Sequence, residues 1–135
     1  MSDQISDEEF INLFETCAFP AADFHHREHV RVVWLYLQKL SVAETLARFS
    51  ENLKRFAAAN GKANLYHETI SWAYVFLINE RIERSGKGSN WDDFATENQD
   101  LLSWQPGILK SFYSDQMLQS ELARRIFVFP DRLSR

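Results

Sequence analysis

Stretches of apolar residues spaced three and four apart run through this chain, and several begin or end at a helix signal. Ser6 is followed three residues later by Glu9, and Ser41 by Glu44. In such a pair the serine side chain accepts a hydrogen bond from an unpaired backbone amide, and the glutamate side chain reaches back to another. Both pairs therefore predict the start of a helix. Strand signals do not recur.

These spacings and breaks predict about six helices. Asp23 is expected to cap the second, Gly61 suits the left-handed residue that ends the third, and Asn64 is expected to start the fourth. Pro106 and Gly107 separate the last two. The expected helices are 7–17, the segment after Asp23, 42–61, 65–84, 91–103 and 115–127, with 85–90 as a loop. We predict an all-α bundle that forms a single domain over 1–135.

Charge and composition exclude several classes of function. The net charge of −4 and the absence of Lys or Arg from the first 26 residues disfavour nucleic acid as a partner. The apolar run Trp72–Ile78 is far shorter than the ~20 residues that cross a bilayer. One cysteine, Cys17, forms no internal disulfide, and the start of the chain lacks the features of a signal peptide. We therefore expect a cytoplasmic protein; the oligomeric state stays open.

All four histidines fall in two short segments that are expected to be helical. His25, His26 and His29 lie in one, and His67 lies in the other. At ~100° per residue, His26 shares a face with Val30, Val33 and Leu37, His29 lies next to that face, and His25 lies at its edge. His67 shares a face with Ile70, Tyr74 and Ile78. The opposite side of the second helix is expected to be polar, with Arg27, Glu28, Arg31, Gln38 and Lys39.

Imidazoles that face inward from two helices are typical of a metal site. His26 and His29 are three residues apart and would bind one divalent ion such as zinc, with His67 as the ligand from the facing helix. The fourth position would hold a water whose pKa the ion lowers, which would permit hydrolytic or hydration chemistry. Glu68 is the expected proton shuttle or outer partner.

Two other interpretations of these histidines remain open. In one, they line a pocket without metal that binds a small anionic or aromatic ligand. In the other, they are structural, and the chain is a helical interaction protein; a large apolar patch on its surface would favour this reading. The sequence leaves open whether the protein is an enzyme, and it names no substrate.

The histidines also belong to a longer pattern. Its parts are F-x-H-x-x-H at 24–29, Y-H-E-T at 66–69, F-Y-S at 112–114, Ala123 with Arg124, and Pro130 with Asp131. This pattern resembles a family of small uncharacterised bacterial all-helical proteins, and the resemblance covers most of the chain. It implies no particular activity. It favours His26 and His29 over His25 as the pair of histidines that forms the site.

The resemblance also brings further side chains towards the site. Tyr113, Ser114 and Arg124 would fix an anionic ligand through a hydroxyl or a guanidinium group. Tyr66 and Thr69 would orient Glu68. Structural roles are the alternative, because Ser114 is a natural helix cap and Arg124 is placed to pair with Glu121.

Overall fold

The computed structural model of the chain describes residues 5–86, 90–104 and 107–132. Of the chain 72% is helical, and the described part contains eight α-helices and no strand, which confirms the predicted all-α class. No helix in this part is long and apolar enough to cross a membrane. Contacts divide the chain into two compact units, one ending at Tyr66 and the other beginning at His67. The single domain over 1–135 stays a prediction.

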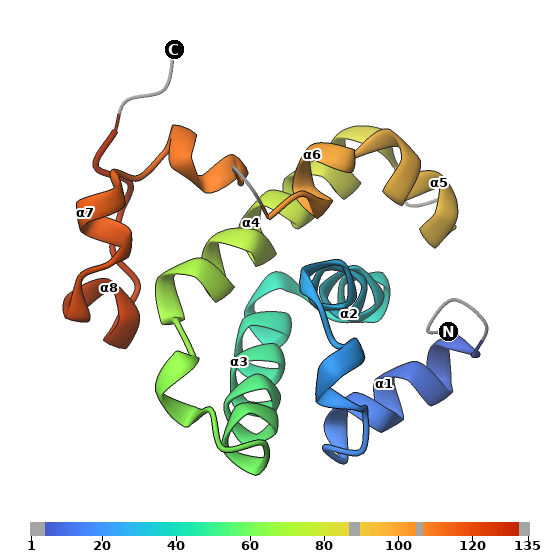
Figure 1. Cartoon of the computed structure of the whole chain (residues 1–135). Helices are drawn as coiled ribbons and strands as arrows, with labels where there is room; N and C mark the ends of the chain where they lie inside the picture. Colours follow the sequence, from blue (N-terminus) through green and yellow to red (C-terminus); the bar gives the residue numbers. More distant parts are fainter. Residues whose placement is uncertain (1–4, 87–89, 105–106, 133–135) are drawn as a thin grey trace. The chain divides into compact units, whose positions relative to one another are not determined.

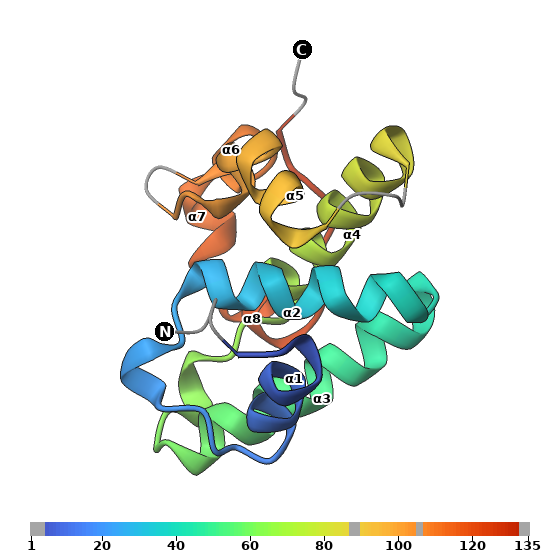
Figure 2. The ribbon, with the colours of Figure 1, turned by 90° about the vertical axis from the view of Figure 1, so that its right-hand side faces the viewer.

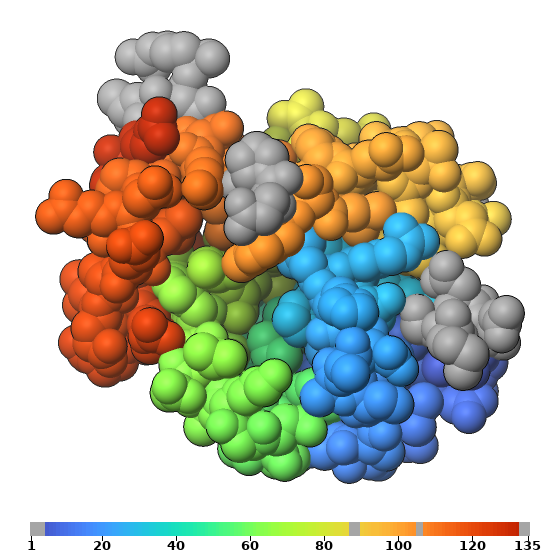
Figure 3. Space-filling model, viewed as in Figure 1, coloured from blue at the N-terminus to red at the C-terminus, as the bar shows by residue number. Residues whose placement is uncertain are grey.

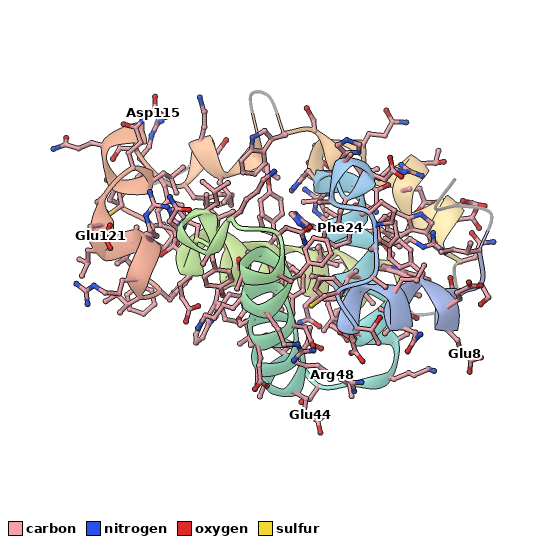
Figure 4. The ribbon with its side chains drawn as sticks, turned by 60° about the horizontal axis from the view of Figure 1, so that its bottom comes forward. Glu8, Phe24, Glu44, Arg48, Asp115 and Glu121 are labelled. Atoms are coloured by element: carbon pink, nitrogen blue, oxygen red, sulfur yellow. The ribbon has the colours of Figure 1, made fainter. Side chains whose placement is uncertain are left out.

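Three helices form the first unit and pack pairwise (Figure 2). Phenylalanine rings fill the space between them. Phe14 stacks on Phe24 at 5.2 Å between ring centroids, and Phe24 lies 4.8 Å from Phe56. Figure 4 shows Phe24 among these helices, whereas Glu8 and Glu44 are directed outward. The helices are α1 (Asp7–Glu15), α2 (His26–Lys39) and α3 (Val42–Ala59).

The two predicted serine caps are present. The Oγ of Ser6 accepts a hydrogen bond from the Glu9 amide at 3.1 Å. Ser41 and Glu44 form the full reciprocal pair, with distances of 3.1 and 2.9 Å. The far end of α1 differs from the prediction, because the helix ends at Glu15 and Cys17 takes a left-handed φ of 62°. A left-handed residue turns the chain out of the helix, so Cys17 does not continue the apolar stripe.

Glu15 joins all three helices of the first unit. Its carboxylate accepts hydrogen bonds from the Tyr36 hydroxyl at 2.5 Å and from the Arg48 side chain at 2.7 and 3.1 Å. Arg55 donates to its backbone oxygen at 2.6 Å. Burial alone would raise the pKa of Glu15, but the hydrogen bonds from Arg48 and Tyr36 outweigh it and lower the pKa. The carboxylate therefore stays ionised where it holds α1 to α2 and α3.

Two residues from the predicted polar side of α2 are buried. The Arg31 guanidinium lies 4.2 Å from the Phe10 ring centroid and donates to the Asp7 carboxylate at 3.0 Å. Glu28 accepts a hydrogen bond from the His25 amide at 2.9 Å. The prediction of exposure was wrong for both, because a charged side chain with a well-placed partner tolerates burial.

The second unit is arranged along its longest helix, α4. The two helices α5 and α6 lie beside the end of α4, where Arg81 pairs with Asp100 at 2.7 Å, and α8 lies beside the start of α4 (Figure 1). The helices are α4 (Glu68–Ser85), α5 (Trp91–Glu97), α6 (Gln99–Leu102), α7 (Asp115–Leu118) and α8 (Glu121–Arg125).

The last two predicted helices are each divided in the structure. The segment 91–103 is interrupted at Asn98, and 115–127 is interrupted at Gln119 and Ser120 and ends at Arg125. Ser120 caps α8 by accepting from the Ala123 amide at 3.1 Å. The predicted loop 85–90 lies partly outside the described residues, as does Pro106. Ser85 itself belongs to α4.

The chain after α8 leaves the helix at the extended Ile126 and continues over α4 without helix or strand as residues 126–132, which we call the strap. The buried Thr69 hydroxyl donates to the Ile126 oxygen at 2.8 Å and accepts from the Val128 amide at 3.1 Å. The Tyr113 hydroxyl donates to the Val128 oxygen at 2.7 Å. Asp131 accepts from the amide and hydroxyl of Ser114 at 2.8 and 2.6 Å. Side chains distant in sequence thus hold the strap in place.

Candidate functional site

His67 is the N-cap of α4 and does not lie on the inward face of that helix. Its Nδ1 accepts a hydrogen bond from the Ile70 amide at 3.1 Å, and its Nε2 faces the Leu118 oxygen at 2.7 Å. Because a carbonyl only accepts, Nε2 carries the proton. The predicted helix start at Asn64 was wrong, since 63–65 forms a separate 3₁₀ turn and the imidazole caps α4 in its place.

Burial keeps His67 mainly neutral at pH 7. Burial is the main cause that lowers its pKa, and the positive charge of Arg124 lowers it further. The hydrogen bond to the Leu118 oxygen raises the pKa, but by less. A metal ligand must offer a nitrogen lone pair, and the Nδ1 lone pair of this ring already accepts from Ile70. Metal coordination by His67 would therefore break the cap or the bond to Leu118.

The other three histidines lie in the first unit, at the start of α2. His25 takes the N-cap position that was predicted for Asp23, which lies in a 3₁₀ turn instead. The side chain of His25 is exposed, and His26 is half-buried as the first residue of the helix.

His29 stands against aromatic rings, with its ring centroid 4.7 Å from that of Phe24 and 6.5 Å from that of Phe49. Burial, together with the neighbouring His26 and His25, lowers the pKa of His29 to about 3. This imidazole is therefore neutral throughout the physiological range. A ring with so low a pKa binds no anion by charge at neutral pH.

The metal hypothesis stays a prediction. Within residues 5–86, 90–104 and 107–132, no group of three or more His, Cys, Asp or Glu side chains is placed to hold a metal ion. His26 and His29 belong to the first unit and His67 to the second, and their predicted convergence stays a prediction too.

The residues predicted around the histidines have separate positions. Tyr66 ends the first unit, and its ring lies 5.2 Å from the Lys54 ammonium group. Glu68 is the half-buried first residue of α4. Thr69 and Tyr113 hold the strap, as described above. Arg124 lies 3.6 Å from Glu121, the pairing given as its structural alternative, and Ser114 caps α7 by accepting from the Met117 amide at 3.0 Å.

A surface pocket of about 260 Å³ opens in the second unit. Apolar and aromatic side chains form most of its wall, and Lys110 and Asp115 face each other at 3.8 Å. The bond from His67 holds Leu118, one of the wall residues. The sequence did not predict this pocket, because its wall comes from several segments that no motif links. It is lined by Ile70, Tyr74, Trp104, Gly107, Leu109, Lys110, Asp115, Leu118 and Gln119.

Four aromatic side chains of the second unit form a continuous, partly exposed cluster, which we call the aromatic surface. The Phe127 ring stacks on Trp72 at 5.7 Å and contacts Phe76 and Phe129, each at 5.9 Å between centroids. Phe76 is 41% exposed and Phe129 is 82% exposed. Leu122 and Ile126, nearby in sequence, are exposed as well. In Figure 3 the segments α7, α8 and the strap appear in orange and red at the surface.

No protein-family model matches the chain, and neither the curated proteins nor the solved structures yield a significant match. The family resemblance therefore stays a prediction. In the structure, several residues of this pattern hold the strap, namely Thr69, Tyr113, Ser114 and Asp131.

The two bonds of His67 can be separated by mutation. An asparagine retains an N-cap acceptor but does not reach Leu118, whereas an alanine offers neither group. We expect His67→Asn to lower the free energy of unfolding by about 1 kcal/mol and His67→Ala by about 2 kcal/mol. Urea denaturation measures both, with Glu51→Ala, an exposed change in the middle of α3, as the control. Equal stability of the two His67 variants would contradict the capping role.

The low pKa of His29 predicts an acid-sensitive fold. An unfolded chain takes up a proton at His29 near pH 6.5, but the folded state does so only near pH 3, so the unfolded state binds more protons between these values. Stability is therefore complete above pH 6.5 and falls as the pH drops, by up to about 1.4 kcal/mol per pH unit. Urea denaturation of the wild-type protein and His29→Gln between pH 5 and 7 measures this slope, with the exposed Lys39→Gln as the control. A slope unchanged in His29→Gln would refute the assignment.

Proposed function

We propose that this protein is a helical interaction module that binds a protein partner through the aromatic surface of its second unit. The exposure of Phe129 carries this proposal, because a phenylalanine with 82% of its surface in water gains stability only when something covers it. The ring contacts from Phe129 through Phe127 to Trp72 and Phe76 make the surface continuous rather than a scatter of single exposed residues.

The histidine geometry supports the same proposal. Of the three interpretations of the sequence, only the interaction protein assigns the histidines a structural role. The Nδ1 of His67 accepts the hydrogen bond that caps α4, and its Nε2 donates to the Leu118 oxygen. His29 is neutral and packs among phenylalanine rings. The fold therefore gives both imidazole rings a structural role. We place the module in the cytoplasm, where its single cysteine stays reduced.

A selection from a phage-displayed random peptide library tests the proposal with the intact protein. Peptides that bind the wild-type chain should bind the double variant Phe76→Ser with Phe129→Ser at least tenfold more weakly, because a buried aromatic side chain contributes about 1.5–3 kcal/mol. Leu65→Ser is the matched control, since Leu65 is 62% exposed and lies in the first unit.

The readout is the dissociation constant of each selected peptide, measured by fluorescence anisotropy. Peptides that bind the double variant and the wild-type protein equally would overturn the proposal, as would a selection that yields no specific peptide. Circular dichroism of each variant confirms that a loss of binding reflects the surface and not the fold.

The pocket in the second unit favours a second candidate function, the binding of a small aromatic ligand. Tyr74 and Trp104 supply aromatic walls, and Leu109 and Leu118 add apolar ones. Burial, with the negative charge of Asp100, raises the pKa of Tyr74 to about 12, so this wall of the pocket is uncharged at pH 7. Lys110 at the rim would attract a carboxylate, although Asp115 stands opposite.

We expect 3-phenylpropionate to shift the amide NMR signals of Leu118 and Gln119 more than 2-phenylethylamine does at equal concentration, because only the former offers a carboxylate to Lys110. Trp104→Ala should abolish the shifts, and Leu65→Ser should not change them. Shifts that persist in Trp104→Ala, or no shift with either compound, would exclude this candidate.

A further inference from the structure

The strap uses one of its two backbone edges to hold itself in place. Thr69 and Tyr113 bind the Ile126 oxygen and both backbone groups of Val128. Ile126 is extended, with φ of −133° and ψ of 163°. In an extended chain, the N–H and C=O groups of alternate residues point to the same edge. The inward edge of the strap is therefore the one formed by Ile126 and Val128.

The opposite edge belongs to Phe127 and Phe129. Among the described residues, no hydrogen bond joins the backbone groups of either residue to another part of the chain. Two amides and two carbonyl oxygens thus lie along an edge that a second extended chain can pair with. No lysine or proline lies within 127–129 to block such pairing. The rings of Phe127 and Phe129 belong to the aromatic surface, so apolar contacts are available at the same edge.

Charge around the strap selects between possible partner chains. Arg124 and Arg125 precede it, and Arg132 lies at its end. Residues 121–132 hold three arginines and two carboxylates, Glu121 and Asp131, so this segment carries a net charge of +1. Arg125 and Arg132 remain exposed at the two ends of the edge. A second strap would bring the same positive charges and be repelled, whereas an acidic chain would be attracted.

We propose that an extended, acidic peptide segment of a partner protein pairs with the outer edge of the strap, at Phe127 and Phe129, by strand addition. This inference rests on the proposed function, because it assigns a partner to the aromatic surface. Main-chain hydrogen bonds would supply much of the affinity, apolar side chains of the peptide would cover the phenylalanine rings, and its carboxylates would face Arg125 and Arg132.

The probe is the acetylated, amidated peptide Glu-Val-Glu-Val-Glu, titrated into the full chain. We expect it to shift the amide NMR signals of Phe127 and Phe129 and to slow their hydrogen exchange. The corresponding Lys-Val-Lys-Val-Lys peptide should bind at least tenfold more weakly. Arg125→Glu should also weaken binding of the acidic peptide at least tenfold, whereas Lys39→Glu, an exposed change in the first unit, should not.

Backbone methylation separates strand addition from side-chain docking. A peptide methylated on every amide nitrogen keeps its side chains but cannot donate hydrogen bonds, so it should lose binding at least tenfold. If the methylated peptide binds as well as the parent and Phe129→Ser weakens both, strand addition fails but the interaction module stands. If neither the parent nor the methylated peptide binds, but library peptides still require Phe76 and Phe129, the acidic partner is refuted and the interaction module stands.

Two other occupants of the surface would overturn the inference. Sedimentation that shows a dimer of the full chain, lost in Phe129→Ser, would assign the edge to a second copy. Binding to phosphatidylserine vesicles without slower exchange at Phe127 and Phe129 would assign the aromatic surface to lipid. Equal affinity for the acidic and basic peptides would remove the charge argument.

Discussion

The Thr69 hydroxyl is the interaction on which the second unit most depends. It is buried at the start of α4 and bonds both to the Ile126 oxygen and to the Val128 amide. This one side chain satisfies two partly buried backbone groups, and a polar group that loses water without gaining a partner destabilises the fold. Only a hydroxyl can donate and accept in this way, since a methyl group of the same size would leave both backbone groups unsatisfied. Together with the bonds from Tyr113 to Val128 and from Ser114 to Asp131, this contact fixes the path of the chain after α8.

The neighbouring contacts extend the same arrangement to α7. His67, two residues before Thr69, bonds to the Leu118 oxygen at the end of α7, and Asp131 in the strap bonds to Ser114 at its start. A helix of four residues has little stability of its own. Side chains from α4 and from the strap therefore hold both ends of α7, and with it one wall of the pocket. His67 and Thr69, which the sequence suggested for a metal or ligand site, form hydrogen bonds chiefly with backbone groups.

The sequence predicted the helix starts that Ser6 and Ser41 cap, but it misplaced the starts of α2 and α4, which histidines cap, and missed the cap of α8 at Ser120. Ser6 and Ser41 start α1 and α3 as expected, because their side-chain oxygens are the usual N-cap acceptors. His25 and His67 occupy the same position for α2 and α4, and no local rule distinguishes a capping imidazole from one on the first turn. The strap was missed for a related reason. Its apolar residues continue the helical spacing, and only Thr69 and Tyr113, more than ten residues away, make it extended.

Capping by an imidazole also changes what the histidines can do. A helix N-terminus favours a lone pair over a positive charge, so the Nδ1 of His67 is most useful to the fold when it is unprotonated. Burial among phenylalanine rings has the same effect on His29. Burial lowers the pKa of both rings, so both are mainly neutral at pH 7 for structural reasons. On the second unit, Phe76 and Phe129 are exposed and Arg125 and Arg132 lie at the surface, and aromatic and arginine side chains are enriched where proteins bind one another.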